Sequence, residues 1–142
     1  MVLQTYTFDN GFKIIYEKPK NKLPITTLQI VCDIGSVYET DGNRGSSHMI
    51  EHMVFKGTKN VKDRKFFFSE FDKFGAYINA TTEKRYTYYT IKSDDKYTFK
   101  CINLISDMLL NSTFDYTEYV KEREVVIEEK DRKSTRLNSS HT

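Results

Sequence analysis

The chain has 142 residues, with 22 Lys and Arg residues against 20 Asp and Glu residues, which gives a formal net charge of +2. This near-neutral balance gives no reason to expect a nucleic acid or an anionic membrane surface as a partner. No apolar run approaches the roughly 18 residues that span a bilayer, so we predict no membrane span. The length fits one small domain with a core of its own.

The last twelve residues, 131–142, differ from the rest of the chain. They hold a single Leu and show no apolar periodicity, so we expect the helical pattern to end before them. Over eleven codons the segment also agrees with the in-frame translation of a common sequencing adapter. We therefore interpret residues 1–130 as the native domain and residues 131–142 as a non-native tail, with a genuine Ser-rich disordered tail as the alternative. Without the tail, basic and acidic residues are equal in number.

The two cysteines bear on the redox state of the cellular compartment. Cys32 and Cys101 lie far apart, and neither belongs to a C-x-x-C pair. Both stand in apolar segments, so we interpret them as small core residues of a protein in the cytoplasm or another reducing compartment. The N-terminus shows neither a secretory signal peptide nor an amphipathic presequence.

The first third of the chain reads as β-strands. Residues 3–8 and 12–16 flank Asn10-Gly11, a pair typical of a hairpin turn because both residues tolerate positive φ. Residues 25–34 are rich in β-branched side chains, so we predict a third strand there and expect it to be central.

Helices and a second hairpin follow. We predict helices at 45–55, with Met49, Ile50 and Met53 buried, and at 63–74, with an inward aromatic stripe of Phe67, Phe71 and Phe74. Residues 76–82 and 85–92 are expected to pair as a hairpin. A buried helix over 94–110 should have Phe99, Ile102, Ile105 and Leu109 on one side, with Cys101, Leu104 and Met108 adjacent. Asp115 should cap a last helix.

The strongest chemical signal is His48-Met49-Ile50-Glu51-His52. Two histidines four positions apart stack on one helical face, about 6 Å apart, and can share one tetrahedral zinc ion. Glu51 lies on the same side, within reach of a water on the metal. The spacing H-x-x-E-H is that of the inverzincins. A coincidental surface pair of histidines is the alternative.

The flanking residues carry a resemblance to a known family. Gly45 to Thr58 closely resembles, over fourteen contiguous positions, the active-site segment of the pitrilysin and mitochondrial-processing-peptidase family. Gly75 to Thr82, followed by Thr87 and Tyr89, is similar to that family's "G-A-x-x-N-A-x-T … T-x-Y" signature. Glu122 to Glu129 resembles its "E-R-x-V-I-L-x-E" stretch. The resemblance implies an α+β fold: an antiparallel sheet with helices packed on one face.

The same resemblance assigns roles on the last helix. Glu122 and Glu129 are seven positions apart and share one helical stripe, which on an isolated helix is ordinarily just solvated. By resemblance, Glu129 is the third zinc ligand beside His48 and His52. Glu122 is then an acid of the catalytic set, two turns back behind the ligands. Glu128 competes for the ligand role, but it lies about 100° away around the helix.

The resemblance also implies how a substrate binds. In that family, the strand that here holds Asn79 and Ala80 is a sheet edge to which an extended peptide adds as another strand. Without the flanking match, Asn79 would read as a turn or bulge residue.

The expected function is therefore a zinc-dependent endopeptidase acting on extended or unfolded peptides, with Glu51 as the group that moves the water's proton. Family members consist of two related halves, and this chain resembles only the first part of the catalytic half. The expected partners are a peptide substrate and the C-terminal half of the same protein or a partner subunit. Two alternatives stay open: a catalytically inactive structural or presenting subunit, and a zinc-stabilised interaction domain.

Overall fold

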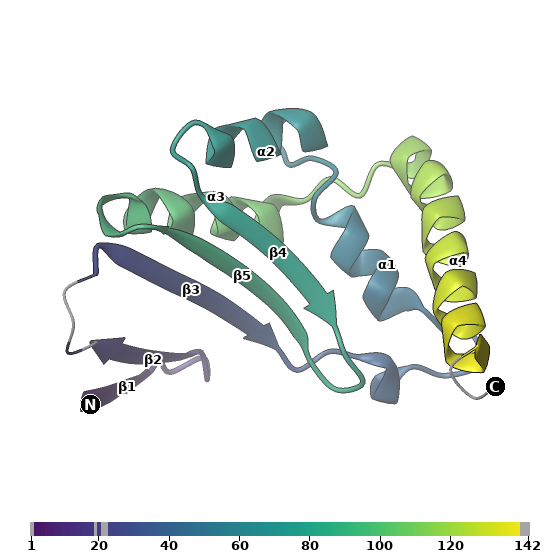
Figure 1. The fold of residues 1–142 in the computed structure, drawn as a ribbon, viewed down its shortest axis with the longest axis horizontal. Helices are drawn as coiled ribbons and strands as arrows, with labels where there is room; N and C mark the ends of the chain where they lie inside the picture. Colours follow the sequence, from purple (N-terminus) through teal and green to yellow (C-terminus); the bar gives the residue numbers. More distant parts are fainter. Residues whose placement is uncertain (1, 19, 21–22, 140–142) are drawn as a thin grey trace.

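A computed structural model of the chain describes residues 2–18, 20 and 23–139 (Figure 1). Its strands are β1 (Val2–Thr7), β2 (Lys13–Lys18), β3 (Ile25–Cys32), β4 (Tyr77–Thr82) and β5 (Thr87–Asp94). Its helices are α1 (Ser46–Met53), α2 (Arg64–Asp72), α3 (Thr98–Asn111) and α4 (Tyr116–Ser139), with 3-10 turns η1 (Ser36–Tyr38) and η2 (Asp95–Tyr97). Within this described part, no helix is both long and apolar enough to cross a membrane.

Three antiparallel strands form the main sheet, in the order β3-β5-β4. The β4–β5 hairpin is confirmed, and it leaves the other edge of β5 to pair with β3. The predicted third strand is confirmed as β3, but the expectation that it is central is wrong: β3 lies at an edge, and its side chains alternate between exposed and half-buried. The central strand is β5, where alternate side chains are buried. The α+β class, with an antiparallel sheet and helices, is confirmed.

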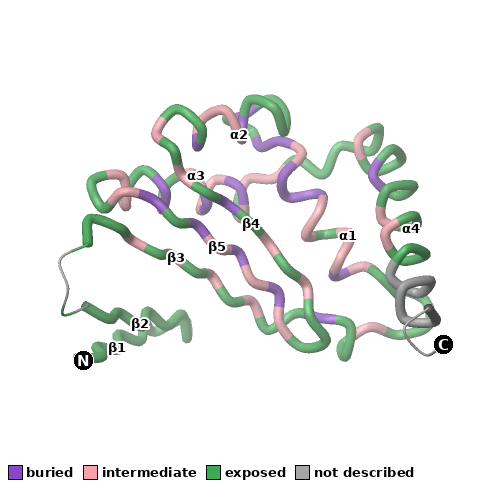
Figure 2. Tube along the Cα trace, viewed as in Figure 1, coloured by how far each residue is buried: buried purple, intermediate pink, exposed green. Residues whose placement is uncertain are grey.

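The core lies between one face of this sheet and the helices (Figure 2). The predicted aromatic stripe is confirmed at Phe67 and Phe71, each 1% exposed, while Phe74 packs half-buried at the margin. Along α3 the prediction was wrong for Phe99, which is 82% exposed. The buried stripe is Cys101, Ile105 and Met108. Phe99 precedes Cys101 by two residues, about 200° around the helix, and so lies on the opposite side.

The N-terminal hairpin is a separate two-stranded sheet. β1 and β2 pair antiparallel, as predicted, with Thr7 opposite Lys13. In the turn, Gly11 alone takes up the positive φ, at 83°, and the Phe12 amide donates to the Asn10 side chain at 3.0 Å. The residues of β2 are all exposed.

Helix α4 packs beside α1 at one end of the molecule (Figure 1). As predicted, Asp115 caps it: the carboxylate accepts hydrogen bonds from the amides of Thr117 at 2.9 Å and Glu118 at 3.1 Å. The helix runs on to Ser139, so the expectation that the helical pattern ends before residue 131 is wrong. The helix needs no apolar face to continue there, because Arg132 and its neighbours have ordinary helix propensity. The non-native origin of residues 131–142 stays a prediction, and residues 140–142 lie outside the described residues.

Candidate metal centre

Helix α1 carries the motif, and its first turn is fixed by a carboxylate. Gly45 precedes the helix with a φ of 89°, a value that favours glycine. The Glu39 carboxylate accepts hydrogen bonds from the amides of Gly45 at 2.7 Å and Ser47 at 2.8 Å. Partial burial raises the pKa of Glu39, but these amide hydrogen bonds outweigh it, so the net pKa is lowered. The ionised carboxylate therefore satisfies donors at the start of α1.

The inner end of α1 is anchored in the core. Met53 is 2% exposed and Val54 is 3% exposed, and Met49 is half-buried. Ile50, predicted to be buried with the methionines, is 43% exposed. Because Ile50 lies about 100° from Met49 around the helix, it cannot share the narrow face that the eight-residue helix turns to the core.

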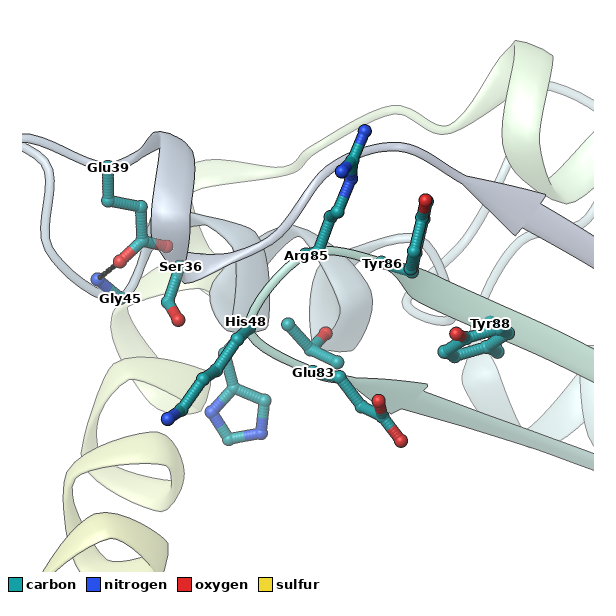
Figure 3. A pocket seen from close by; sticks show the side chains of 10 residues that line it. Ser36, Glu39, Gly45, His48, Glu83, Arg85, Tyr86 and Tyr88 are labelled. Carbon is teal, nitrogen blue, oxygen red and sulfur yellow. Dashed lines mark hydrogen bonds between the residues drawn. The ribbon is translucent and has the colours of Figure 1, made fainter.

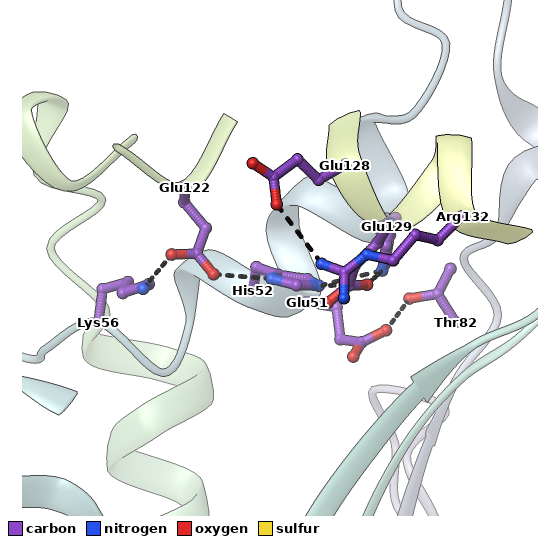
Figure 4. A network of polar contacts seen from close by, with 9 residues as sticks. Glu51, His52, Lys56, Thr82, Glu122, Glu128, Glu129 and Arg132 are labelled. Carbon is purple, nitrogen blue, oxygen red and sulfur yellow. Dashed lines mark hydrogen bonds and ion pairs between the residues drawn. The ribbon is translucent and has the colours of Figure 1, made fainter. Parts of the chain in front are cut away.

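Three predicted ligands converge on one point. His48 and His52 face each other with their Nε2 atoms 3.0 Å apart, and a carboxylate oxygen of Glu129 lies 3.5 Å from the first and 3.7 Å from the second (Figure 4). All three side chains are partly buried. Helix α4 therefore brings Glu129 to the motif helix although 77 positions separate it from His52.

The spacing of these atoms fits a metal ion. The three atoms lie on a circle of radius about 2.0 Å, close to the zinc–nitrogen and zinc–oxygen distances of about 2.0–2.2 Å. Two imidazole nitrogens and one carboxylate oxygen are also the donor set of catalytic zinc sites, which leave a fourth position open. The residues present thus fit zinc in both spacing and chemistry.

Glu122 lies directly behind His52. Its residue is 3% exposed, and one oxygen is 2.8 Å from His52 Nδ1, while the other forms an ion pair with Lys56 Nζ (Figure 4). Burial raises the pKa of Glu122, but the contacts with Lys56 and His52 lower it below its usual range. An acceptor at Nδ1 favours the tautomer that leaves Nε2 free for a metal. Glu122 thus contacts the Nδ1 side of His52, opposite the Nε2 atom that lies near His48 and Glu129.

Glu128, the rival of Glu129, points away from the three ligand atoms. Its side chain is 73% exposed and pairs with Arg132 at 3.4 Å (Figure 4). The helical register expected from the sequence therefore places Glu129, not Glu128, beside the histidines.

Two contacts were missed by the sequence reasoning. Lys56 reaches Glu122, and the Thr82 hydroxyl donates to a carboxylate oxygen of Glu51 at 2.5 Å (Figure 4). Both residues stood inside the segments that carried the resemblance. No local sequence pattern indicates these two contacts, because the partner residues come from other elements of the fold.

Asn79 and Ala80 lie on β4, at an edge of the three-stranded sheet. Asn79 is exposed and pairs in regular register with Thr90, so the alternative of a turn or bulge is wrong. The end of β4 opens onto a hollow of about 830 Å³ beside the metal centre, lined by His48, Thr82 and Tyr88 among others (Figure 3). A peptide pairing along this edge would thus lead toward the ligands.

Known proteins share this sequence and fold. The family model described as insulinase, peptidase family M16, matches residues 14–141. The zinc protease YmxG of Bacillus subtilis is 36% identical over 128 residues, covering 90% of this chain and 31% of that protein. The β subunit of the mitochondrial processing peptidase of Rattus norvegicus is 31% identical over 134 residues, covering 94% of this chain and 27% of that protein.

Further comparisons match a subunit of another protein complex and two solved structures. Subunit 1 of the mitochondrial cytochrome b-c1 complex of Rattus norvegicus is 33% identical over 126 residues, covering 89% of this chain and 26% of that protein. Among solved structures, a protease from Helicobacter pylori superposes with a TM-score of 0.85 at 30% identity, covering 90% of this chain and 30% of that one. An inactive M16 domain from Pseudomonas fluorescens shares the fold, with a TM-score of 0.79 at 17% identity, over 87% of this chain and 30% of that one.

The chain spans between a quarter and a third of the length of these relatives. The match nevertheless covers nine-tenths of the chain itself and runs through both motif helices and the β4–β5 hairpin. The resemblance stated from the sequence is confirmed: this chain belongs to peptidase family M16, the insulinase family.

Proposed function

We propose that this chain forms the metal-binding part of a zinc-dependent endopeptidase that hydrolyses peptide bonds in extended or unfolded peptides. One observation carries the proposal: nitrogen and oxygen atoms of His48, His52 and Glu129 converge at spacings that suit zinc, with Glu51 on the same helix. The zinc protease YmxG among the relatives supports the choice of metal.

Each of the site residues has a separate role in the proposed reaction. A zinc ion held by the three ligands would lower the pKa of a water molecule toward about 7 and polarise the carbonyl of the scissile peptide bond. Glu51 accepts the proton of that water and passes it to the leaving amine. Glu122 holds His52 in one tautomer, and Lys56 compensates the charge of Glu122 in its buried position.

The substrate pairs along β4. An added strand makes backbone hydrogen bonds next to Asn79 and Ala80, which demands an extended peptide and little sequence preference. The remaining contacts to the substrate come from the C-terminal half of the same protein or from a partner subunit, because this chain spans only 31% or less of its relatives' length. A reducing compartment remains our proposal for its location, based on the core positions of Cys32 and Cys101.

A second candidate is a non-catalytic subunit. Its support is that subunit 1 of the cytochrome b-c1 complex, and an M16 domain described as inactive, are among the related proteins and folds. The complete set of ligands and the presence of Glu51 favour the peptidase over this candidate.

The test compares the chain with the complete protein, including any sequence that flanks these 142 residues in its gene. We expect the complete protein to cleave an unstructured peptide, to lose that activity with a chelator, and to regain it with zinc. The 142-residue chain alone should bind zinc more weakly and show almost no cleavage, because positioning by the missing part is a large share of the rate. Zinc binding by the complete protein with no hydrolysis of any peptide would favour the non-catalytic subunit.

A further inference from the structure

The residue of interest is Thr82, the last residue of β4. Its hydroxyl lies 2.5 Å from a carboxylate oxygen of Glu51, and both side chains are partly buried. Hydrogen bonds to an ionised acceptor are about twice as strong as those between neutral groups, and partial burial adds to that strength. The contact joins helix α1 to the sheet at the point where β4 reaches the hollow (Figure 4).

The neighbouring threonine shows which way the proton of Thr82 points. Thr87 stands opposite Thr82 in the β4–β5 register. Its hydroxyl oxygen is 2.9 Å from the carbonyl oxygen of Ile34 and 3.4 Å from the hydroxyl oxygen of Thr82. A hydroxyl has one proton, and the shorter contact to Ile34 takes it. The Thr82 hydroxyl likewise donates to its nearer acceptor, the Glu51 carboxylate oxygen at 2.5 Å, while Thr87 donates to the backbone that follows β3.

Thr82 suits the task of holding a carboxylate. A Glu side chain has three rotatable bonds and loses considerable entropy when it is held in one orientation. Thr is β-branched and stiff at χ1, and here it projects from a strand paired on one side to β5. One oxygen of Glu51 is thus fixed from outside its own helix, which leaves the second oxygen to accept a proton.

The same strand carries the expected substrate contacts. Side chains alternate along β4, so Thr82 shares a face with Ala80 and Ile78, whereas Asn79 and Thr81 lie on the other face. A peptide that pairs with β4 would therefore lie against the same backbone that holds the Glu51 carboxylate.

We infer that Thr82 is a positioning residue: its hydroxyl orients the Glu51 carboxylate and ties it to the strand along which the substrate pairs. This inference rests on the proposed peptidase function. Glu51 is the catalytic residue, and Thr82 acts only through it.

The test uses Thr82→Val in the complete zinc-loaded protein, since Val keeps the branched shape and removes the donor. We expect kcat to fall about 10- to 100-fold, as for other small misplacements of a reacting group, with zinc content and KM within about twofold. Thr82→Ser should restore most of kcat. The matched control is Thr27→Val, the same exchange at an exposed position of β3, the other edge of the sheet, which should leave kcat unchanged.

Two further measurements separate positioning from a structural role. In a Glu51→Gln background, Thr82→Val should lower kcat no further, because the group it orients is already gone. In a crystal structure of the metal-free Thr82→Val protein, the Glu51 carboxylate should lose its single orientation while His48 and His52 keep theirs.

The contrary outcomes are distinct. An unchanged kcat, an equal loss in Thr27→Val, or an equal further loss in the Glu51→Gln background would overturn the inference. If the wild-type protein cleaves no peptide, the peptidase proposal is wrong, and the orientation of Glu51 in the crystal structure of Thr82→Val alone decides whether Thr82 holds it.

Discussion

The two helices that supply the proposed metal ligands are held in place by different forces. Helix α1 has Met53 and Val54 in the core and a carboxylate cap from Glu39 at its first turn. Helix α4 has one buried residue among positions 116–132, and that residue is Glu122, a charged side chain. Among the described apolar side chains of α4, Val126 is half-buried and five are exposed, namely Tyr116, Tyr119, Val120, Val125 and Ile127.

The difference shows what each half of the site depends on. His48 and His52 are placed by ordinary core packing, so they should survive changes elsewhere. Glu129 is placed by a helix whose buried residue, Glu122, contacts His52 of α1 and forms an ion pair with Lys56, just beyond the end of α1. Metal binding should therefore stabilise α4 against α1, and damage to the polar contacts should loosen the carboxylate ligand first.

The largest expected effect comes from the proton-transfer group on α1. Glu51→Gln in the complete protein should retain zinc and lose about 10²- to 10⁴-fold in peptide hydrolysis, because an amide cannot accept the water's proton. Steady-state cleavage and bound zinc are measured on the same sample. Glu124→Gln, on an exposed position of α4, is the control and should be neutral. Near-normal turnover of Glu51→Gln would remove this residue from the mechanism.

The next effect is on metal affinity. His48→Ala, His52→Ala and Glu129→Ala should each weaken zinc binding by more than about 100-fold, since loss of a residue behind a ligand already costs about 10- to 100-fold. Glu128→Ala is the matched control on α4, because that side chain is 73% exposed and pairs with Arg132. Competition with a chromophoric chelator measures the affinities. If Glu128→Ala releases zinc and Glu129→Ala does not, the helical register is displaced by one residue.

The attachment of α4 is tested through Lys56. Lys56→Met should lower the free energy of unfolding by about 3 kcal/mol, because it leaves a carboxylate buried at 4% exposure without its cation. Zinc affinity should fall about 10-fold as Glu122 and His52 lose their fixed geometry. Lys59→Met, at an exposed position nearby, should change neither.

A double variant separates the two roles of this ion pair. Lys56→Met combined with Glu122→Gln removes both charges, so stability should recover while zinc affinity stays low. Recovery of both would mean that the pair serves the packing of α4 and not the orientation of His52.

Local sequence patterns predicted correctly those features of the fold that depend only on local backbone geometry. The face shared by His48, Glu51 and His52 follows from helical periodicity, and the Asn10-Gly11 hairpin and the Asp115 cap follow from turn and cap chemistry. The ligand role proposed for Glu129 could be inferred only from the resemblance, because acidic residues on one face of a helix do not indicate which residues pack against that face.

What failed was decided by tertiary neighbours. A β-branched run predicts a strand but not its place in the sheet, so residues 25–34 were expected in the centre and β3 lies at an edge. The sequence of α3 offers two apolar faces, and the face that is buried in the fold contains Cys101 rather than Phe99. Lys56 and Thr82 have partners on other elements, which spacing along the chain cannot reveal.

A smaller effect concerns the core side of the comparison. Asp107 on α3 accepts hydrogen bonds from Thr58 at 2.5 Å, Asn111 at 2.8 Å and Asn60 at 2.5 Å, which ties the segment after α1 to the core. Burial raises the pKa of Asp107, but these hydrogen bonds outweigh it, so the folded-state pKa lies below the ordinary value of an aspartate. The ionised form therefore stabilises the fold above about pH 4, and this contribution is lost as the pH falls through the folded-state pKa.

The Asp107→Asn variant measures this contribution. It should lower the free energy of unfolding by about 1–2 kcal/mol at pH 7, because its amide group meets donors where the carboxylate accepted. The difference from wild type should shrink below about pH 4, as the wild-type carboxyl takes up its proton. Asp72→Asn, at an exposed end of α2, is the control. Denaturant titrations at pH 7 and pH 3 give both values; a difference that does not depend on pH would contradict the assignment.

The smallest effect is expected at the far end of α4. Deleting residues 131–142 should change the free energy of unfolding by less than about 0.5 kcal/mol. The described side chains there, Asp131 and Arg132, are exposed, and the ion pair of Arg132 with Glu128 at 3.4 Å joins two side chains that are 68% and 73% exposed. Such i,i+4 pairs contribute about 0.3–0.5 kcal/mol on a helix surface.

A chain ending at Lys130 still holds Glu122 and Glu129, so zinc affinity should also be retained, apart from fraying of the last turn around Glu129. The matched variant Arg132→Ala removes the ion pair without shortening the helix and separates these two causes. A clear loss of stability on deletion, beyond that of Arg132→Ala, would show that the tail is part of the native protein.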